Sequence, residues 1–238
     1  MKLGVIIINR NHIKYTIDLI TQLSVQSCLD FELTVVDNGS TEPGTRESLD
    51  QLSFSFLKKI EYTGQNRPLN HVWNDFALKN NYELCCFLNN DLIIPKNFIK
   101  DTLDVFEREP RVGCVAHSTN HPNYQSCTQL EYRIFHGKYR QGWDFTMRRS
   151  AYSQIPRNLH FFCGDDYLYD MLYRKGWNFA IITSSPIIHF QGITPRIPGI
   201  SNRDVSEYKK MGFSHGKLDV CFDLCAFKPT FLKINELS

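Results

Sequence analysis

The sequence predicts an α/β fold built on a mostly parallel central sheet. Over the first ninety residues, short apolar runs rich in β-branched residues alternate with amphipathic segments, which is typical of successive strand–helix–strand units. The chain has 238 residues, of which 42% are hydrophobic and 22% charged, values that suit one domain or a domain with a small appendage. We therefore expect one α/β domain with a sizeable core.

Hydrophobic spacing places the elements of the first half. The apolar run at residues 3–8 predicts a strand, after which apolar residues recur at the spacing of one helix face through residue 27. A second apolar run at residues 31–36 stops at a cluster of turn formers, and Pro43 suits the start of a helix. The same reasoning predicts strands at residues 59–62 and 82–88, with a helix at residues 69–79 between them.

The second half begins with a helix that Pro95 opens and Pro110 closes. A strand follows at residues 112–116, whereas residues 117–145 lack clean periodicity and suit either functional loops or short antiparallel strands. The remaining expected elements are a helix from Asp165 to a stop at Gly176, strands at 179–182 and 187–190, and a mobile Pro/Gly/Arg-rich stretch from Gly192 to about Arg203.

Charge and cysteine content limit the classes of function. The balance of Lys and Arg over Asp and Glu is −3 for residues 1–95, 0 for 96–130 and +5 for 131–238. The basic second half suits an anionic partner, or it is a solvated surface. The eight cysteines lack paired C-x-x-C spacing, and no run approaches the ~18 apolar residues of a membrane span. We expect a cytoplasmic protein, with peripheral attachment to a membrane as an alternative.

Two predicted strands end in carboxylates, Asp37 and Asp91. In open α/β sheets, ligands bind beyond the carboxyl ends of the strands, so these residues are candidate ligand contacts. The first strand-to-helix turn, at residues 9–12, has none of the glycines that cradle a pyrophosphate, which argues against a dinucleotide-binding turn and a P-loop. A diphosphate can instead be bound through a divalent cation, and Asp91 could hold one.

Five short motifs occur in the order and spacing of a known family. They are Val5-Ile6-Ile7-Ile8 with Asn11, Val35-Val36-Asp37-Asn38-Gly39-Ser40-Thr41, Asn66 with Asn74, Phe87-Leu88-Asn89-Asn90-Asp91 with Pro95, and Gly164-Asp165-Asp166 followed by His189. With these motifs the chain resembles the glycosyltransferase family 2-like enzymes, which have the GT-A fold and use nucleotide-sugar donors. The resemblance implies a GT-A domain at residues 1–192, with a nucleotide-sugar-binding half (1–95), an acceptor half (96–192) and a short C-terminal extension (193–238).

The resemblance implies a nucleotide-binding role for several residues. Asp37 matches the acidic residue that binds the nucleobase of the donor. Asn9 and Asn11 lie where the first loop of the family lines the same pocket, and Asn66 and Arg67 fall in a loop that can contact the nucleotide.

It also implies the residues that do the chemistry. Asn89-Asn90-Asp91 matches the DxD motif, with Asp91 on the metal and Asn89 and Asn90 beside the bound donor. Asp166 matches the general base, Asp165 its acidic neighbour, and His189 the histidine often found on the metal. Asn89 replaces the first acidic residue of the motif, so the metal has one carboxylate fewer.

These residue types suit glycosyl transfer. A carboxylate within hydrogen-bond reach can take the proton of an acceptor hydroxyl, and a divalent metal, Mn²⁺ or Mg²⁺, can neutralise the departing diphosphate. Direct attack by the acceptor inverts the anomeric carbon. A UDP-sugar is the favoured donor on family grounds, although related enzymes also use deoxythymidine and guanosine donors and the sequence does not choose among them. A glycan, a lipid-linked glycan diphosphate or a nucleic acid with a hydroxylated base would each supply the acceptor hydroxyl.

Other readings stay open. The change at Asn89 leaves room for a non-catalytic protein that binds nucleotide sugars or acts as a scaffold. A sugar nucleotidyltransferase would need a glycine-rich loop after the first strand, which residues 9–12 do not supply. Trp143 and Asp144 suit either contacts with an acceptor sugar or packing in the core.

Overall fold

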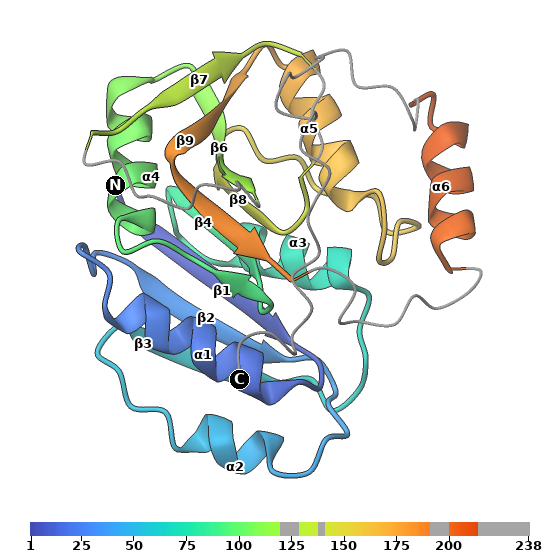
Figure 1. The fold of residues 1–238 in the computed structure, drawn as a ribbon. Coiled ribbons are helices and arrows are strands. Elements are labelled where there is room, and N and C mark those ends of the chain that lie inside the picture. Colours follow the sequence, from blue (N-terminus) through green and yellow to red (C-terminus); the bar gives the residue numbers. More distant parts are fainter. Residues whose placement is uncertain (120–128, 138–140, 191–199, 214–238) are drawn as a thin grey trace.

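The computed structural model of the chain describes residues 1–119, 129–137, 141–190 and 200–213. Within these residues, nine strands form one sheet that lies between helices (Figure 1). The strand order is β3-β2-β1-β4-β8-β6-β9-β5, and β7 pairs with β9. The elements are β1 (Leu3–Asn9), α1 (Ile13–Ser24), β2 (Glu32–Asp37), α2 (Thr45–Asp50), β3 (Leu57–Tyr62), α3 (Leu69–Lys79), β4 (Leu84–Asn89), β5 (Leu92–Ile93), α4 (Phe98–Arg108), β6 (Val112–Thr119), β7 (Tyr132–Phe135), β8 (Asp144–Arg148), α5 (Gly164–Arg174), β9 (Asn178–His189) and α6 (Ile200–Lys210).

The four strands from β3 to β4 form the parallel part of the sheet. β1 pairs in parallel with β2 on one side and with β4 on the other, and β3 joins β2 in parallel. The strands and helices expected in this half are confirmed, although α1 ends at Ser24 rather than at residue 27. Parallel pairing brings the carboxyl ends of the strands to one edge, where Asn9 lies beside Asp37 and Ile8 lies beside Asn89.

The second half of the sheet is mixed. β8 runs antiparallel to both of its neighbours, β4 and β6, whereas β6 and β9 are parallel. β7 is antiparallel to β9. Of the two alternatives for residues 117–145, short antiparallel strands are therefore present.

The two strands expected at residues 179–182 and 187–190 are one strand, β9, so this prediction was wrong. The register with β6 shifts between the pairs His117–Ile182 and Thr119–Ile187, so β9 advances three residues more than β6 there. Pro186 lies in this irregular stretch, where a strand tolerates a residue without an N–H. The interruption in the apolar pattern is an irregular stretch within one strand rather than a loop between two strands.

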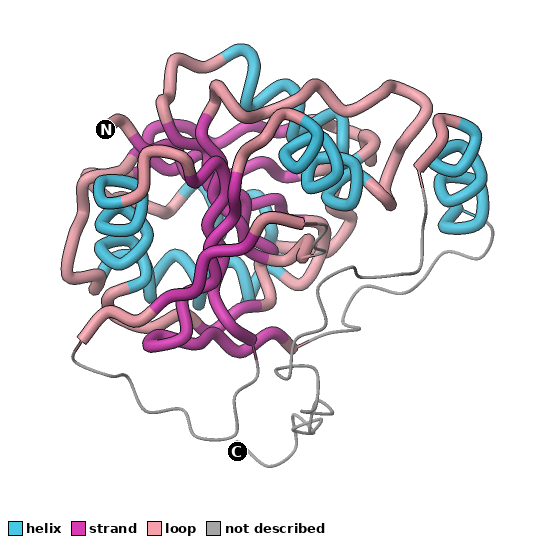
Figure 2. Tube along the Cα trace, turned by 90° about the horizontal axis from the view of Figure 1, so that it is seen from above, coloured by secondary structure: helices cyan, strands magenta, loops and turns pink. Residues whose placement is uncertain are grey.

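The sheet has two apolar faces because successive side chains alternate. Along β1, Val5 and Ile7 join the cluster formed with α1, α2 and α4, whereas Ile6 joins the cluster formed with α3 and α5. The neighbours Cys86 and Phe87 divide between the same two clusters. Figure 2 shows the strands running between the helices. In the described part of the chain, no helix is both long and apolar enough to cross a membrane.

The last element among the described residues, α6, begins at residue 200, so the mobile stretch expected up to about Arg203 is partly a helix. Asp204 and Tyr208 are fully buried on it, and Tyr208 donates a hydrogen bond to Asp170 of α5. These contacts dock α6 on the domain. Most of the extension expected at residues 193–238 lies outside the described residues.

Candidate functional site

A buried cluster of polar side chains lies at the carboxyl edge of β1 and β2. Nδ2 of Asn9 donates hydrogen bonds to Oδ1 of Asp37 and to Oγ of Ser40, both at 3.0 Å. Ser40 donates to the same oxygen of Asp37. One carboxylate oxygen of Asp37 is thus held by the protein, and no donor among the described residues binds the other.

Thr16 links this cluster to the turn after β4. Its hydroxyl is buried on α1, donates to Oδ1 of Asn9 at 2.7 Å and accepts from Nδ2 of Asn90 at 3.1 Å. The structure therefore joins Asp37, Asn9 and Asn90 in one chain of hydrogen bonds.

Asn11 holds the turn between β1 and α1 against the loop after β2. Its side-chain oxygen accepts the backbone N–H groups of Thr41 and Glu42 at 2.8 and 3.2 Å. Asn11 and His12 have φ angles of 60° and 53°, in the left-handed region that asparagine tolerates better than most residues. The side chain of Asn11 thus fixes the loop after β2 beside the carboxyl edge of the sheet.

Asn38 ties the loop after β3 to the loop after β2. Its Nδ2 donates to Oδ1 of Asn66 at 3.2 Å and to the carbonyl of Arg67 at 2.9 Å, and its Oδ1 accepts the N–H of Arg67 at 3.0 Å. Gly39 has a φ of +72°, and a Cβ there would lie 2.4 Å from the carbonyl carbon of Gln65. Only glycine fits this close approach.

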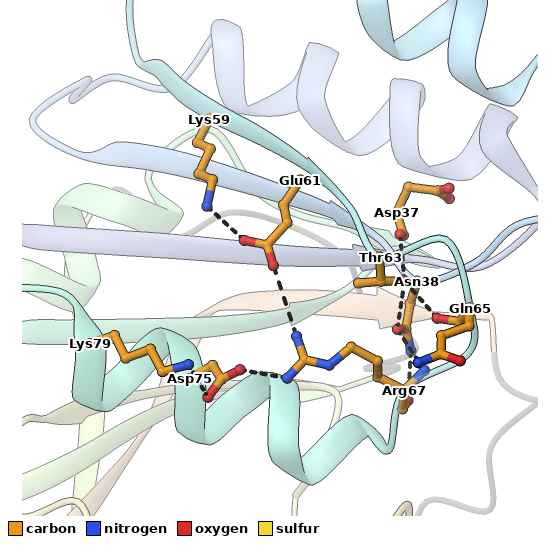
Figure 3. A network of polar contacts seen from close by, with 9 residues as sticks. All are labelled: Asp37, Asn38, Lys59, Glu61, Thr63, Gln65, Arg67, Asp75 and Lys79. Atoms are coloured by element: carbon orange, nitrogen blue, oxygen red, sulfur yellow. Dashed lines mark hydrogen bonds and ion pairs between the residues drawn. The ribbon is translucent and has the colours of Figure 1, made fainter.

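The guanidinium of Arg67 extends along α3 and β3. It pairs with Asp75 on α3 and lies 3.8 Å from Oε1 of Glu61 on β3. Lys59 pairs with Glu61 at 2.7 Å and Lys79 pairs with Asp75 at 2.9 Å, so the charges alternate along a row (Figure 3). The backbone of Arg67 contacts Asn38, whereas its charged side chain helps to hold the loop on β3 and α3.

Asp91 and His189 meet because β5 pairs with β9. Leu92 lies opposite His189, and the N–H of Phe190 donates to the carbonyl of Asp91 at 3.1 Å. Nε2 of His189 is 3.2 Å from Oδ1 of Asp91, and both side chains are largely buried. The ring of Trp143 stacks on His189 at a centroid distance of 5.2 Å.

This pair fits a cation that also binds the substrate. Carboxylate and imidazole are both ligands of Mn²⁺, and Mg²⁺ is commonly bound by one or two carboxylates together with substrate phosphates and water. Among the described residues, no group of three or more His, Cys, Asp or Glu side chains is placed to hold a metal. The donor set therefore suits a metal completed by phosphate oxygens rather than an all-protein cage.

A cavity of about 310 Å³ lies beside the start of α5. Asn89 at the end of β4, Asp165 and Asp166 all line it, and Asp166 is buried. A Cβ on Gly142 would lie 2.7 Å from Oδ2 of Asp165, so the glycine leaves room for this carboxylate. The structure thus brings the acidic pair to the end of a strand at the carboxyl edge.

Asp144 belongs to the core rather than to the cavity. It is fully buried, its Oδ2 accepts the N–H of His117 at 3.0 Å and lies 3.3 Å from Nδ1 of the same histidine, and burial raises the pKa of its carboxyl. Trp143 donates from Nε1 to Oγ1 of Thr119 at 2.8 Å. Of the two readings of Asp144, packing in the core is the one observed.

Four polar residues of this region had no role assigned from the sequence: Thr16, Asn38, Ser40 and Asp204. Asn38 and Ser40 stand inside the motif that contains Asp37, and that motif was the signal for them. Thr16 is a polar residue on the buried face of α1, which was a weaker signal. Asp204 stands in a stretch with no recognisable pattern.

Comparison with known proteins shows the family to which this chain belongs. The family model of glycosyl transferase family 2 matches residues 4–178. An uncharacterized glycosyltransferase of Nostoc sp., alr2836, is 29% identical over 118 residues, which are 49% of this chain and 36% of that protein. The chain spans little more than a third of the length of this relative.

Solved structures show the same fold at low sequence identity. S. aureus TarS 1–349 is 18% identical with a TM-score of 0.58, over 77% of this chain and 58% of that chain. GalNAc-T7, solved with UDP, GalNAc and Mn²⁺, is 12% identical with a TM-score of 0.69, over 87% of this chain and 47% of that chain. The family match covers well over half of the residues and the fold is GT-A, so this chain belongs to glycosyl transferase family 2.

Proposed function

We propose that this chain transfers a glycosyl group from a UDP-sugar to an acceptor hydroxyl, with inversion at the anomeric carbon. The observation that carries the proposal is the cavity shared by Asn89, at the end of β4, and the acidic pair of α5, Asp165 and Asp166. A donor bound along the carboxyl edge would place its sugar beside this cavity, where the acceptor hydroxyl would meet it.

The donor half of the proposal rests on the carboxyl edge. Asp37 keeps one oxygen with no protein donor among the described residues, which suits an N–H of a nucleobase. Asn9 and Asn11 would shape the nucleobase pocket, and the loop with Asn66 and Arg67 would border it. A TarS structure was solved with UDP-GlcNAc, and its fold resembles this one with a TM-score of 0.56 at 16% identity over 81% of this chain and 60% of that chain.

Asp91 and His189 would hold Mn²⁺ or Mg²⁺ together with the diphosphate. When bound, such a cation supplies positive charge where the leaving group becomes more negative. Asn89 would hydrogen bond the donor without adding a charge, and Asn90 would keep the turn in place through Thr16.

Asp166 would act as the general base. It would take the proton from the acceptor hydroxyl as that oxygen bonds to the anomeric carbon and the bond from this carbon to the diphosphate oxygen breaks on the opposite face. Such help is typically worth roughly 10²–10⁴-fold in rate. Asp165, the acidic neighbour of the base, packs against Gly142 and lines the same cavity.

The role of Asp166 is tested by comparing turnover with nucleotide binding. We expect Asp166→Asn to lower the turnover of a UDP-sugar by at least about 100-fold and to leave UDP affinity unchanged. The exposed Asp18 on α1 offers a matched control, Asp18→Asn, which should keep full turnover. Transfer at the wild-type rate by Asp166→Asn would refute the assignment of the base.

The metal site and the binding-protein alternative are tested by calorimetry. Nucleoside diphosphates are titrated into the wild type and into Asp91→Ala, each with and without Mn²⁺. We expect metal-dependent binding of UDP by the wild type and its loss in the variant. UDP binding without any turnover of UDP-sugars would favour the alternative of a non-catalytic protein.

The acceptor is proposed as a hydroxyl of a glycan, a lipid-linked glycan diphosphate or a nucleic acid. The excess of basic residues after residue 130 supports an anionic acceptor, although Arg148 is used in the fold, where it donates to the carbonyls of Val112 and Phe106. Lys138 and Arg140, which contribute to this excess, lie outside the described residues. A steep fall of activity with salt would support an anionic acceptor, and salt indifference a neutral glycan.

A further inference from the structure

Helix α6 forms a wall of the cavity that contains the acidic pair. Ser201 and Val205 on α6 line this cavity together with Asp165 and Asp166. Figure 1 shows α6 beside the loops that lead to α5. The family match ends at residue 178, so this wall comes from a part of the chain beyond the match.

Asp204 is a buried polar contact between α6 and the loop before α5, beside the more exposed contacts of Glu207 with Asn158 and of Arg203 with His160. Its side chain is fully buried, and its Oδ2 accepts three consecutive backbone N–H groups. The donors are His160 at 3.2 Å, Phe161 at 2.8 Å and Phe162 at 2.9 Å. Successive N–H groups that converge on one anionic oxygen form a nest, and hydrogen bonds to a charged acceptor are stronger than neutral ones.

The loop held by Asp204 continues without a break into α5. Phe161 and Phe162 line the cavity, Cys163 follows with a φ of 58°, and Asp165 and Asp166 lie in the first turn of the helix. The conformation of residues 160–163 therefore determines where α5 begins and where the carboxylates of its first turn lie.

Asn70 on α3 holds the same loop from the other side. Its N–H donates to the carbonyl of His160 at 3.0 Å, and its Nδ2 donates to the carbonyl of Phe162 at 3.2 Å. A Cβ on Gly164 would lie 2.0 Å from Oδ1 of Asn70, so the start of α5 packs directly on this side chain. The loop is thus fixed between Asn70 and Asp204.

We propose that Asp204 is a positioning residue for glycosyl transfer: it holds the loop at residues 160–162 so that Asp166 and the cavity wall face the acceptor. This inference rests on the function proposed above, because it gives Asp204 a part in the same reaction. Asp204 acts through the backbone of the loop and does not touch the reacting atoms.

Two substitutions at one position separate the hydrogen bonds from the bulk of the side chain. Asp204→Ala removes the acceptor of all three N–H groups. Asp204→Asn keeps an oxygen for them, and Oδ1 of Asp204 has no hydrogen-bond partner in the described part of the chain, so the new amide NH₂ displaces no contact there. We expect Asp204→Ala to lower the turnover of a UDP-sugar by about 10- to 100-fold, and Asp204→Asn to restore much of it.

UDP affinity should stay within about twofold of wild type in both variants, because the proposed nucleotide contacts lie at the ends of β1 and β2. Amide hydrogen exchange should become faster at residues 160–162 in Asp204→Ala. The matched control is Tyr208→Phe, which removes the buried hydrogen bond from α6 to Asp170 and leaves the acceptor of the three loop N–H groups in place. This control should keep its turnover and its exchange at residues 160–162.

Wild-type turnover in Asp204→Ala would overturn the proposal, as would an equal loss in Asp204→Ala and Tyr208→Phe, since the docking of α6 would then be all that matters. A wild type that binds UDP and turns over a UDP-sugar leaves the proposed function standing in either case. A wild type that neither binds UDP nor turns over any UDP-sugar overturns the proposed function and, with it, the role of Asp204.

Discussion

Replacing Asp37 with asparagine tests the proposed nucleobase contact with a change of one atom. Oδ1 of Asp37 accepts hydrogen bonds from Asn9 and Ser40. Both partners are donors there, so asparagine must place its carbonyl oxygen at this position and its NH₂ at the position of Oδ2. At the position of Oδ2, which would accept a nucleobase N–H, the variant then has an NH₂ group, so two hydrogen-bond donors face each other.

The size of the effect follows from the loss of that one contact. A hydrogen bond to a charged group contributes about 1.5–3 kcal/mol, and every 1.4 kcal/mol is a factor of ten in affinity. We expect UDP to bind about 10- to 100-fold more weakly to Asp37→Asn. Because the contacts with Asn9 and Ser40 keep an acceptor, the free energy of unfolding should fall by only about 1 kcal/mol.

The assay is calorimetric titration of UDP in the presence of Mn²⁺, with chemical denaturation of the same samples. Asp18→Asn is the control, because it makes the same change in net charge at an exposed site. UDP affinity in Asp37→Asn equal to that of the wild type would refute the contact. A similar weakening in Asp18→Asn would assign the effect to net charge instead.

Three further predictions concern the fold. Gly39→Ala should lower the free energy of unfolding by about 1–3 kcal/mol in urea titrations, because φ is +72° and the new methyl would lie 2.4 Å from the backbone of Gln65; no loss would contradict this. The hydrogen bond from Lys58 lowers the pKa of Glu32 to about 2, so Glu32→Gln should cost less than about 1 kcal/mol at neutral pH, and the difference from wild type should shrink between about pH 4.5 and pH 2. Burial raises the pKa of Cys85 to about 12, so iodoacetamide should label this thiol at pH 8 only after unfolding, which peptide mass spectrometry can follow.

The first half of the molecule could be predicted because its signals are local. The helix at residues 69–79 has the bounds that its spacing predicts, and Asp37 and Asn89 stand at strand ends, as the apolar runs before them indicate. Parallel strands bring such ends together whatever the details of packing. The hydrogen bonds of Thr16 could not be predicted in the same way, because they join three segments that are distant in sequence.

The second half depends on contacts that spacing does not encode. β8 enters the sheet between β4 and β6, and nothing in its five residues identifies those neighbours. The sequence around Pro186 likewise suggests a loop, and only the pairing of β6 with β9 on both sides of it shows that the strand continues. Composition made the stretch before Arg203 look mobile, whereas buried contacts on Asp204 and Tyr208 hold α6 in place.

The two ends of the proposed reaction are therefore built in different ways. The donor edge is made by side chains at strand ends and in the turns that follow them, within the region matched by the family. The cavity beside Asp166 is lined in part by α6, which lies beyond that region and is attached in part through backbone N–H groups that any residues other than proline would offer at positions 160–162. The carboxylate at position 204 binds the backbone of this loop and not its side chains. The side chains of α6 and of the loop that face the cavity can therefore change while these hydrogen bonds are kept. Under the function proposed above, acceptor preference would thus vary on this side of the molecule while the carboxyl edge and the position of Asp166 stay the same.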